Sequence, residues 1–209
     1  MVSNLVKRGK MKKKNKRGFD FKKEYKLSWD FLKESKNYIY SVIAIFFGFA
    51  LIGYFMPVSD SFRDYVLKFL QELLMQTEGL SQFEMINFIF WNNIQSGFMG
   101  MIFGFALGVF PVLATLANGY FLGFVASLVV GESGLSILWK LVPHGIFELP
   151  AIFISYGMGM KFGSFAFEKK KLEKFKEYFW NSLRVFILVV LPLLVIAAVI
   201  EGSLISLLG

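Results

Sequence analysis

The sequence predicts an all-α integral membrane protein, a polytopic bundle of about five transmembrane helices with an amphipathic helix on its outer side. Three observations lead to this prediction. Hydrophobic residues make up 56% of the 209 residues, above the roughly 45–50% that is usual for soluble domains. These residues are concentrated in runs close to the length of about 20 residues that a bilayer requires. Lysine and arginine gather in two segments outside the runs.

The first element is a basic arm, residues 1–36, which includes "KRGKMKKKNKRG". Within the arm, Phe21, Tyr25, Trp29 and Leu32 recur at helical spacing among lysines, which predicts an interfacial helix on the cytoplasmic surface. Basic arms also bind nucleic acid. Beside a membrane span, the charge favours an anchor attracted to anionic headgroups. With no nucleic-acid motif elsewhere, we expect membrane lipids and not nucleic acid as partners.

Residues 37–209 are expected to form one transmembrane domain. Residues 60–78 carry apolar side chains at helical spacing with charged side chains between them, which predicts an amphipathic helix. This helix either packs on the bundle or binds a partner. A break at Pro111 is expected to separate the second and third spans. The predicted spans are residues 38–55, 93–110, 112–130, 143–162 and 183–200.

The lysines predict the orientation of these spans, because cytoplasmic segments carry an excess of lysine and arginine. Four spans separate the basic arm from the second lysine-rich segment, residues 169–176, so both lie on the same side. The N-terminus is then inside and the C-terminus outside. Residues 57–92, whose bases are only Arg63 and Lys68, lie outside. We therefore expect a multi-pass protein of the cell (plasma) membrane.

The second predicted span carries four glycines spaced 3, 4 and 4 residues apart, which places them along one helical face. A face without side chains lets a neighbouring backbone approach closely. Tight helix packing is one interpretation, and a water-filled path lined by small residues is the other. The glycines are Gly97, Gly100, Gly104 and Gly108.

The fourth predicted span contains the only histidine of the chain, in "PHGIFELPAIF". His144 and Glu148 are four residues apart, so their side chains can reach each other. They begin a polar and small stripe that continues through Ala151, Ser155 and Gly159. A carboxylate exposed to hydrocarbon is unfavourable by several kcal/mol, so the stripe must face protein or water. Pro150 lacks an N–H, and a kink is expected there.

The predicted topology places His144, Glu148 and Asn93 in the outer third of the membrane, where we expect an intramembrane polar cluster. Asn118 lies nearer the cytoplasmic side and is expected to make a separate contact. Three interpretations of the cluster remain open: a hydrogen-bonded structural clamp, proton or ion chemistry, and binding of a lipid headgroup or peptide.

Catalytic and metal chemistry find little support in the sequence. The chain has no cysteine and one histidine, which excludes thiolate catalysis and a multi-histidine zinc site within one chain. Ser155 has no nucleophile elbow around it. We therefore expect no catalytic residue, no metal and no cofactor, and we expect that the protein is not an enzyme.

Three segments together resemble the stage II sporulation protein M family of integral membrane proteins: "NNIQSGFMG", "NGYFLG" and "PHGIFELPAIFIS". The clear form of the third segment is more similar to the broad, non-sporulating branch. The motif residues implied by the resemblance are Asn93, Asn118, Gly119, Pro143, His144, Gly145, Glu148, Leu149 and Pro150.

The resemblance implies a membrane scaffold, because the namesake in endospore formers recruits cell-wall hydrolases and is not known as an enzyme. We therefore expect a scaffold with membrane or cell-envelope protein partners, and a homodimer is a weaker expectation. The alternative is a small transporter or channel that moves protons, ions or lipid through a path near His144 and Glu148.

Overall fold

The computed structural model of this protein describes residues 20–56, 58–134 and 142–208, and every regular element in these residues is helical. The predicted all-α class is confirmed to that extent. The elements in chain order are α1 (Phe21–Glu34), α2 (Lys36–Phe55), α3 (Asp60–Thr77), α4 (Gln82–Ile102), η1 (Phe103–Phe105), α5 (Val109–Ser133), α6 (Val142–Gly163), η3 (Ser164–Phe167), α7 (Lys171–Val185), η4 (Phe186–Val190) and α8 (Leu191–Leu208).

Three helical segments among the described residues are long and apolar enough to cross a membrane, judged by length and composition. They are Lys36–Phe55, Val109–Gly131 and the continuous helix Lys171–Ser206. The helices α4 and α6 are also long but carry polar residues such as Asn93 and Glu148 along their length. Such residues lower the hydropathy of a helix without preventing it from crossing a bilayer inside a bundle.

Polar side chains set where several helices begin. Ser59 caps α3 by accepting a bond from the backbone N–H of Phe62. Ser81 and Glu84 form a reciprocal capping box at the start of α4. Because the first N–H groups of a helix have no partner within it, these side chains stabilise the helix start.

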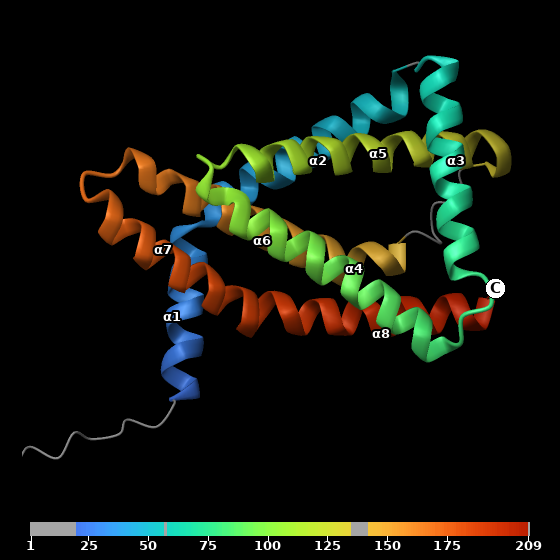
Figure 1. Ribbon diagram of the computed structural model, residues 1–209. Coiled ribbons are helices and arrows are strands. Elements are labelled where there is room, and N and C mark those ends of the chain that lie inside the picture. The colour runs from blue at the N-terminus through green and yellow to red at the C-terminus, as the bar shows by residue number, and fades with distance from the viewer. Residues whose placement is uncertain (1–19, 57, 135–141, 209) are drawn as a thin grey trace, which may run out of the picture.

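The central helix of the bundle is α6. It contacts α2, α4, α5, α7 and α8, and in Figure 1 it lies between the α2–α5 pair and the long α7–α8 helix. Ala151, Ser155 and Met158 of α6 are fully buried. The helix continues through Pro150, which is exposed. The helix that contains the segment "PHGIFELPAIF" therefore lies where the other helices meet.

Glycines allow α2 and α5 to pack with their backbones in close contact. A Cβ atom added at Gly119 would overlap the carbonyl of Phe46, and one at Gly123 would overlap the carbonyl of Ala50. Small residues at such crossings are typical of membrane helices, whose association depends on close van der Waals packing.

The reversal between α4 and α5 lies earlier than the predicted break at Pro111. Helix α4 ends at Ile102, and Leu107 and Gly108 have φ values of 57° and 73° in the left-handed region. Pro111 lies in the first turn of α5. A proline is tolerated there because the N–H groups of a first turn have no partner within the helix. The predicted span 93–110 is therefore wrong in its boundaries, since its last residues form the turn.

The long C-terminal helix contains one π-helical segment, η4, between α7 and α8. Pro192 follows directly in α8. Because Pro192 has no N–H to donate to the carbonyl of Leu188 four residues earlier, the regular α-helical bonding is interrupted at this point. A wider turn lets the helix continue across the interruption.

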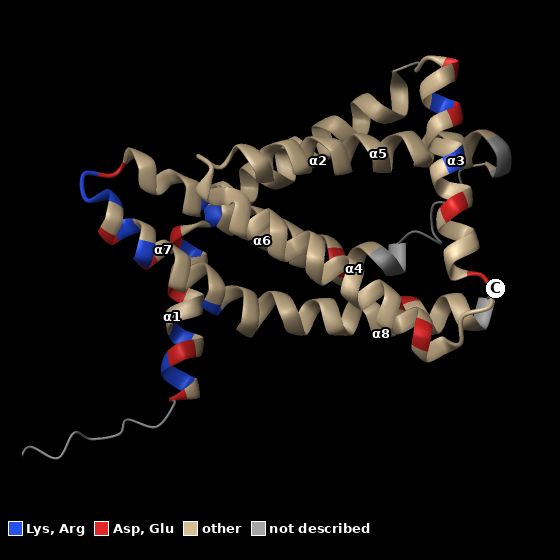
Figure 2. Cartoon of the chain, in the orientation of Figure 1, with Lys and Arg blue, Asp and Glu red and all other residues tan. Residues whose placement is uncertain are grey.

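Two amphipathic helices stand across opposite ends of the bundle, α1 at one end and α3 at the other (Figure 1). An ion pair between Glu24 and Arg184 and the contact of Phe31 with Tyr178 hold α1 against α7. Figure 2 shows lysine and arginine concentrated at the α1 end. Among the described residues, only Arg63 and Lys68 carry positive charge at the α3 end.

Candidate functional site

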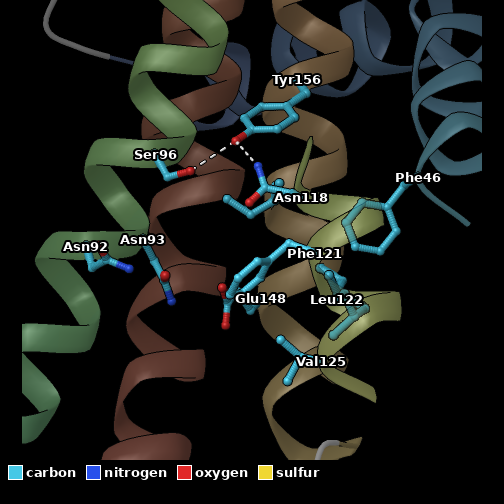
Figure 3. A pocket seen from close by; sticks show the side chains of 12 residues that line it. Phe46, Asn92, Asn93, Ser96, Asn118, Phe121, Leu122, Val125, Glu148 and Tyr156 are labelled. Carbon is cyan, nitrogen blue, oxygen red and sulfur yellow. Dashed lines mark hydrogen bonds between the residues drawn. The ribbon is translucent and has the colours of Figure 1, made fainter. Parts of the chain in front are cut away.

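A cavity of about 250 Å³ lies among α2, α4, α5 and α6. Figure 3 shows amide, carboxylate and hydroxyl groups on one part of its wall and apolar side chains on the rest. None of the described lining residues is a lysine, arginine or histidine. The lining residues are Phe46, Asn92, Asn93, Ser96, Asn118, Phe121, Leu122, Val125, Glu148, Leu149, Ile152 and Tyr156.

Helix α6 presents two faces through the segment that follows His144. Glu148, Ile152 and Tyr156 are four residues apart and line the cavity, as the periodicity of a helix requires. The neighbouring face, with Ser155 and Gly159, packs directly on α4. The predicted stripe is thus divided: Glu148 faces the cavity, while Ser155 and Gly159 are covered by protein.

Hydrogen bonds join three of the lining residues at one end of the cavity (Figure 3). The hydroxyl groups of Tyr156 and Ser96 are 3.0 Å apart and hydrogen-bonded. The side-chain amide of Asn118 donates to the Tyr156 hydroxyl at 3.3 Å and to the backbone carbonyl of Ala114 at 2.8 Å. Tyr156 therefore connects α4, α5 and α6 through one oxygen atom (Figure 3).

This network corrects the expectation that Asn118 makes a separate contact. Asn118 lines the same cavity as Asn93 and Glu148. The prediction placed it by its depth along α5 alone, whereas the cavity extends along α6 from Glu148 to Tyr156, whose hydroxyl bonds to Asn118. Tyr156 and Ser96 are cavity residues that the sequence analysis missed. The four-residue spacing from Glu148 through Ile152 to Tyr156 was the signal that could have identified Tyr156.

Asn93 differs from the other amides of the cavity. Its side chain is only 5% exposed, and its Nδ2 atom has no hydrogen-bond partner in the structure. Leaving a buried donor unpaired is unfavourable by about 1–3 kcal/mol. Asn93 and Glu148 both point into the cavity, from α4 and α6 (Figure 3). A group with an acceptor oxygen placed there would satisfy this donor.

All four glycines predicted to form one face lie against α6, since a Cβ atom added at Gly108 would be 3.4 Å from the Met160 backbone. Gly97 lies beside Ser155, and added Cβ atoms would overlap the Tyr156 ring at Gly100 and the Gly159 backbone at Gly104. Only Gly97 and Gly100 belong to α4, since Gly104 is in η1 and Gly108 follows in the turn. The predicted continuous helical face therefore ends at Ile102.

The remaining motif residues fall in different surroundings. Leu149 lines the cavity, and Gly119 packs on α2. Gly145 lies in the first turn of α6 beside Leu149. Pro143 and His144 belong to α6 by their backbone, but their side chains lie outside the described part of the structure. The predicted contact between His144 and Glu148 therefore stays a prediction.

The described residues contain no group of three or more histidine, cysteine, aspartate or glutamate side chains that could hold a metal ion. The cavity combines one carboxylate with amide and hydroxyl groups. Such a set can hold a neutral or polar ligand by hydrogen bonds, or a cation through Glu148.

Fold and site together define a protein whose described residues form helices, three of them long and apolar enough to cross a membrane, with a polar cavity between α4, α5 and α6. The chain belongs to the stage II sporulation protein M family, whose model matches residues 42–204. This match confirms the resemblance. An uncharacterized protein of Methanocaldococcus jannaschii is 26% identical over 176 residues, which cover 79% of this chain and 76% of the relative. This archaeal relative agrees with the broad branch. No solved structure matches the chain.

Proposed function

We propose that this protein is a non-enzymatic scaffold of the cell membrane that crosses the bilayer five times and holds protein partners at its outer surface. The spans of this proposal are α2, α4, α5, α6 and the α7–α8 helix. Family membership supports the membrane setting, and three of the five helices have sufficient length and hydropathy. The buried Asn93 of α4 and Glu148 of α6 line the same cavity between these helices, so these two polar groups are directed toward protein.

The charge distribution supports an orientation with the N-terminus inside and the C-terminus outside. The five helices alternate in direction, so α1, η1 and η3 lie at one end and α3 lies at the other (Figure 1). The lysines of α1 and α7 gather at the first end (Figure 2). The positive-inside rule assigns that end to the cytoplasm.

The observation that carries the scaffold role is the exposure of α3. Val66 is its only buried residue, although apolar side chains recur along the helix. Leu74 and Met75 are 69% and 68% exposed. A helix that the bundle covers so little has surface available for a partner or for the membrane interface.

Substitution of the exposed apolar pair tests this role. We expect Leu74→Ser with Met75→Ser to abolish partner recovery after cross-linking in native membranes, with partners identified by mass spectrometry. Leu172→Ser on α7, where the side chain is 71% exposed, is the matched control and should leave recovery unchanged. Equal recovery from all three proteins would contradict a scaffold that uses α3.

A second candidate function is transport, and the cavity with Glu148 and Asn93 favours it. The purified protein in liposomes would then move protons, cations or lipid, and Glu148→Gln would reduce the rate. Absence of flux above empty liposomes, across several solutes and a pH gradient, would exclude this candidate.

Dimerisation through exposed apolar surface is part of the scaffold proposal. Native mass spectrometry of the detergent-solubilised protein should then give twice the protomer mass of 23.9 kDa. A single species at the protomer mass would contradict it.

A further inference from the structure

A second and larger space lies beside the polar cavity, between α3 and α5. This groove has a volume of about 880 Å³ and a mostly apolar wall. Phe62 and Phe69 of α3 pack edge-on against Tyr120 and Phe121 of α5, with ring centroids 6.1 and 6.0 Å apart. The volume lies within the range of about 300–1,000 Å³ that small-molecule sites occupy.

The groove and the cavity meet at a common wall. Asn92, Asn118 and Phe121 line both spaces. On one side of this wall lie the polar groups of Asn93 and Glu148, and on the other side lie the aromatic rings beneath α3. The two spaces together have the polarity pattern of an amphiphile, with a polar end inside the bundle and an apolar end under the surface helix.

The polar end selects the headgroup. The Nδ2 atom of Asn93 is a buried donor without a partner, so the ligand must offer an acceptor oxygen. Glu148 also lines the cavity, and no described lining residue of either space is positively charged. A phosphate headgroup would find no positively charged partner among the described lining residues and would lose its hydration without compensation. A hydroxyl group accepts from Asn93 and donates to a carboxylate, which has several acceptor positions.

The size of the polar cavity agrees with such a headgroup. A water molecule takes about 30 Å³ of liquid volume, so a cavity of about 250 Å³ exceeds the space that a single bridging water would occupy. The lining also contains both hydrogen-bonding and apolar groups. A glycerol unit, with hydroxyl groups and a short carbon backbone, matches this combination.

We infer that the cavity and the groove form one binding site for a neutral glycerolipid, with its hydroxyl-bearing headgroup against Asn93 and Glu148 and its acyl chain between α3 and α5. This site does not depend on the scaffold role, because the ligand binds a single chain. It specifies the lipid that the transport candidate would carry.

Native mass spectrometry of the full chain in detergent tests the site, with monopalmitoylglycerol as the neutral probe and palmitoyl lysophosphatidylglycerol as the anionic probe. We expect the neutral probe to bind at least tenfold more tightly. We expect Asn93→Leu to weaken its binding roughly fivefold, the equivalent of about one hydrogen bond. The melting temperature of Asn93→Leu should be unchanged or higher, because this substitution removes an unpaired buried donor.

A groove variant makes the test independent of the cavity. Ala117 lines the groove and is exposed, so Ala117→Phe should fill the space and weaken binding of the neutral probe at least tenfold. Ala44→Phe, on an exposed face of α2 outside both spaces, is the control and should bind as the wild type does. Equal affinity for both probes, or wild-type affinity in both Asn93→Leu and Ala117→Phe, would overturn the proposal. Partner recovery through α3 is a separate measurement, and its outcome does not alter this one.

Discussion

Ser155 of α6 donates a buried hydrogen bond of 2.6 Å to the backbone carbonyl of Gly97 on α4. The two helices are in contact at this point, and a Cβ atom added at Gly97 would lie 3.5 Å from the Ser155 hydroxyl, an ordinary contact distance. A small residue on one helix and a hydroxyl on the other thus fix the register of α4 against α6.

The first prediction concerns this bond. We expect Ser155→Ala to lower the free energy of unfolding by roughly 0.6–1 kcal/mol, the usual contribution of one interhelical hydrogen bond. Thermal unfolding in detergent measures the change. Ser41→Ala is the control, because the exposed Ser41 hydroxyl bonds only to Asn37 of its own helix. If both variants unfold at the same temperature, the bond to Gly97 does not stabilise the bundle.

The second prediction concerns the contact between α2 and α5. We expect Gly123→Ala to destabilise the protein by about 1–3 kcal/mol, since its methyl group would overlap the Ala50 carbonyl and push the helices apart. Gly48→Ala on α2 is the matched control, because a Cβ atom there meets nothing within 4 Å. The same unfolding assay compares the two, and an unchanged Gly123→Ala protein would mean that α2 and α5 are less closely packed.

The third prediction concerns the hydrogen bonds that converge on Tyr156. We expect Tyr156→Phe to destabilise the protein by about 1 kcal/mol, because Ser96 loses its partner and Asn118 retains only the Ala114 carbonyl. A double-mutant cycle with Ser96→Ala isolates the pair. The two substitutions should be less than additive, and strict additivity would show that the hydroxyl groups are not coupled.

The fourth prediction concerns the orientation in the membrane. The chain has no cysteine, so single cysteines report accessibility without background. A membrane-impermeant maleimide should label Lys68→Cys on α3 in intact cells. Lys170→Cys, which lies just before α7, should react only after permeabilisation, because the basic end faces the cytoplasm. The opposite labelling pattern would reverse the proposed topology.

Much of the fold could be predicted from the sequence. Apolar runs, and the proline, glycine and polar residues between them, predicted helices that the structure contains. The bounds of α2 and α3 were predicted to within two residues. The α4–α5 reversal was misplaced because Pro111 was taken as the break. Leu107 and Gly108 form the turn instead, with φ values of 57° and 73°. A proline is also found in the first turn of helices, so Pro111 alone did not show on which side of it the reversal lies.

By itself, the sequence determined the helical class, the separation of basic and acidic ends, and membership of the stage II sporulation protein M family, because hydropathy, charge and motif spacing belong to contiguous residues. Tertiary structure alone decided that Asn118 and Tyr156 share a cavity with Glu148, and that a groove beneath α3 lies on the other side of a wall formed by Asn92, Asn118 and Phe121. Those relationships depend on how helices cross. Backbone contacts at glycines such as Gly119 and Gly123 govern how the helices cross. This crossing cannot be predicted from the order of residues along one helix, because it depends on contacts between helices.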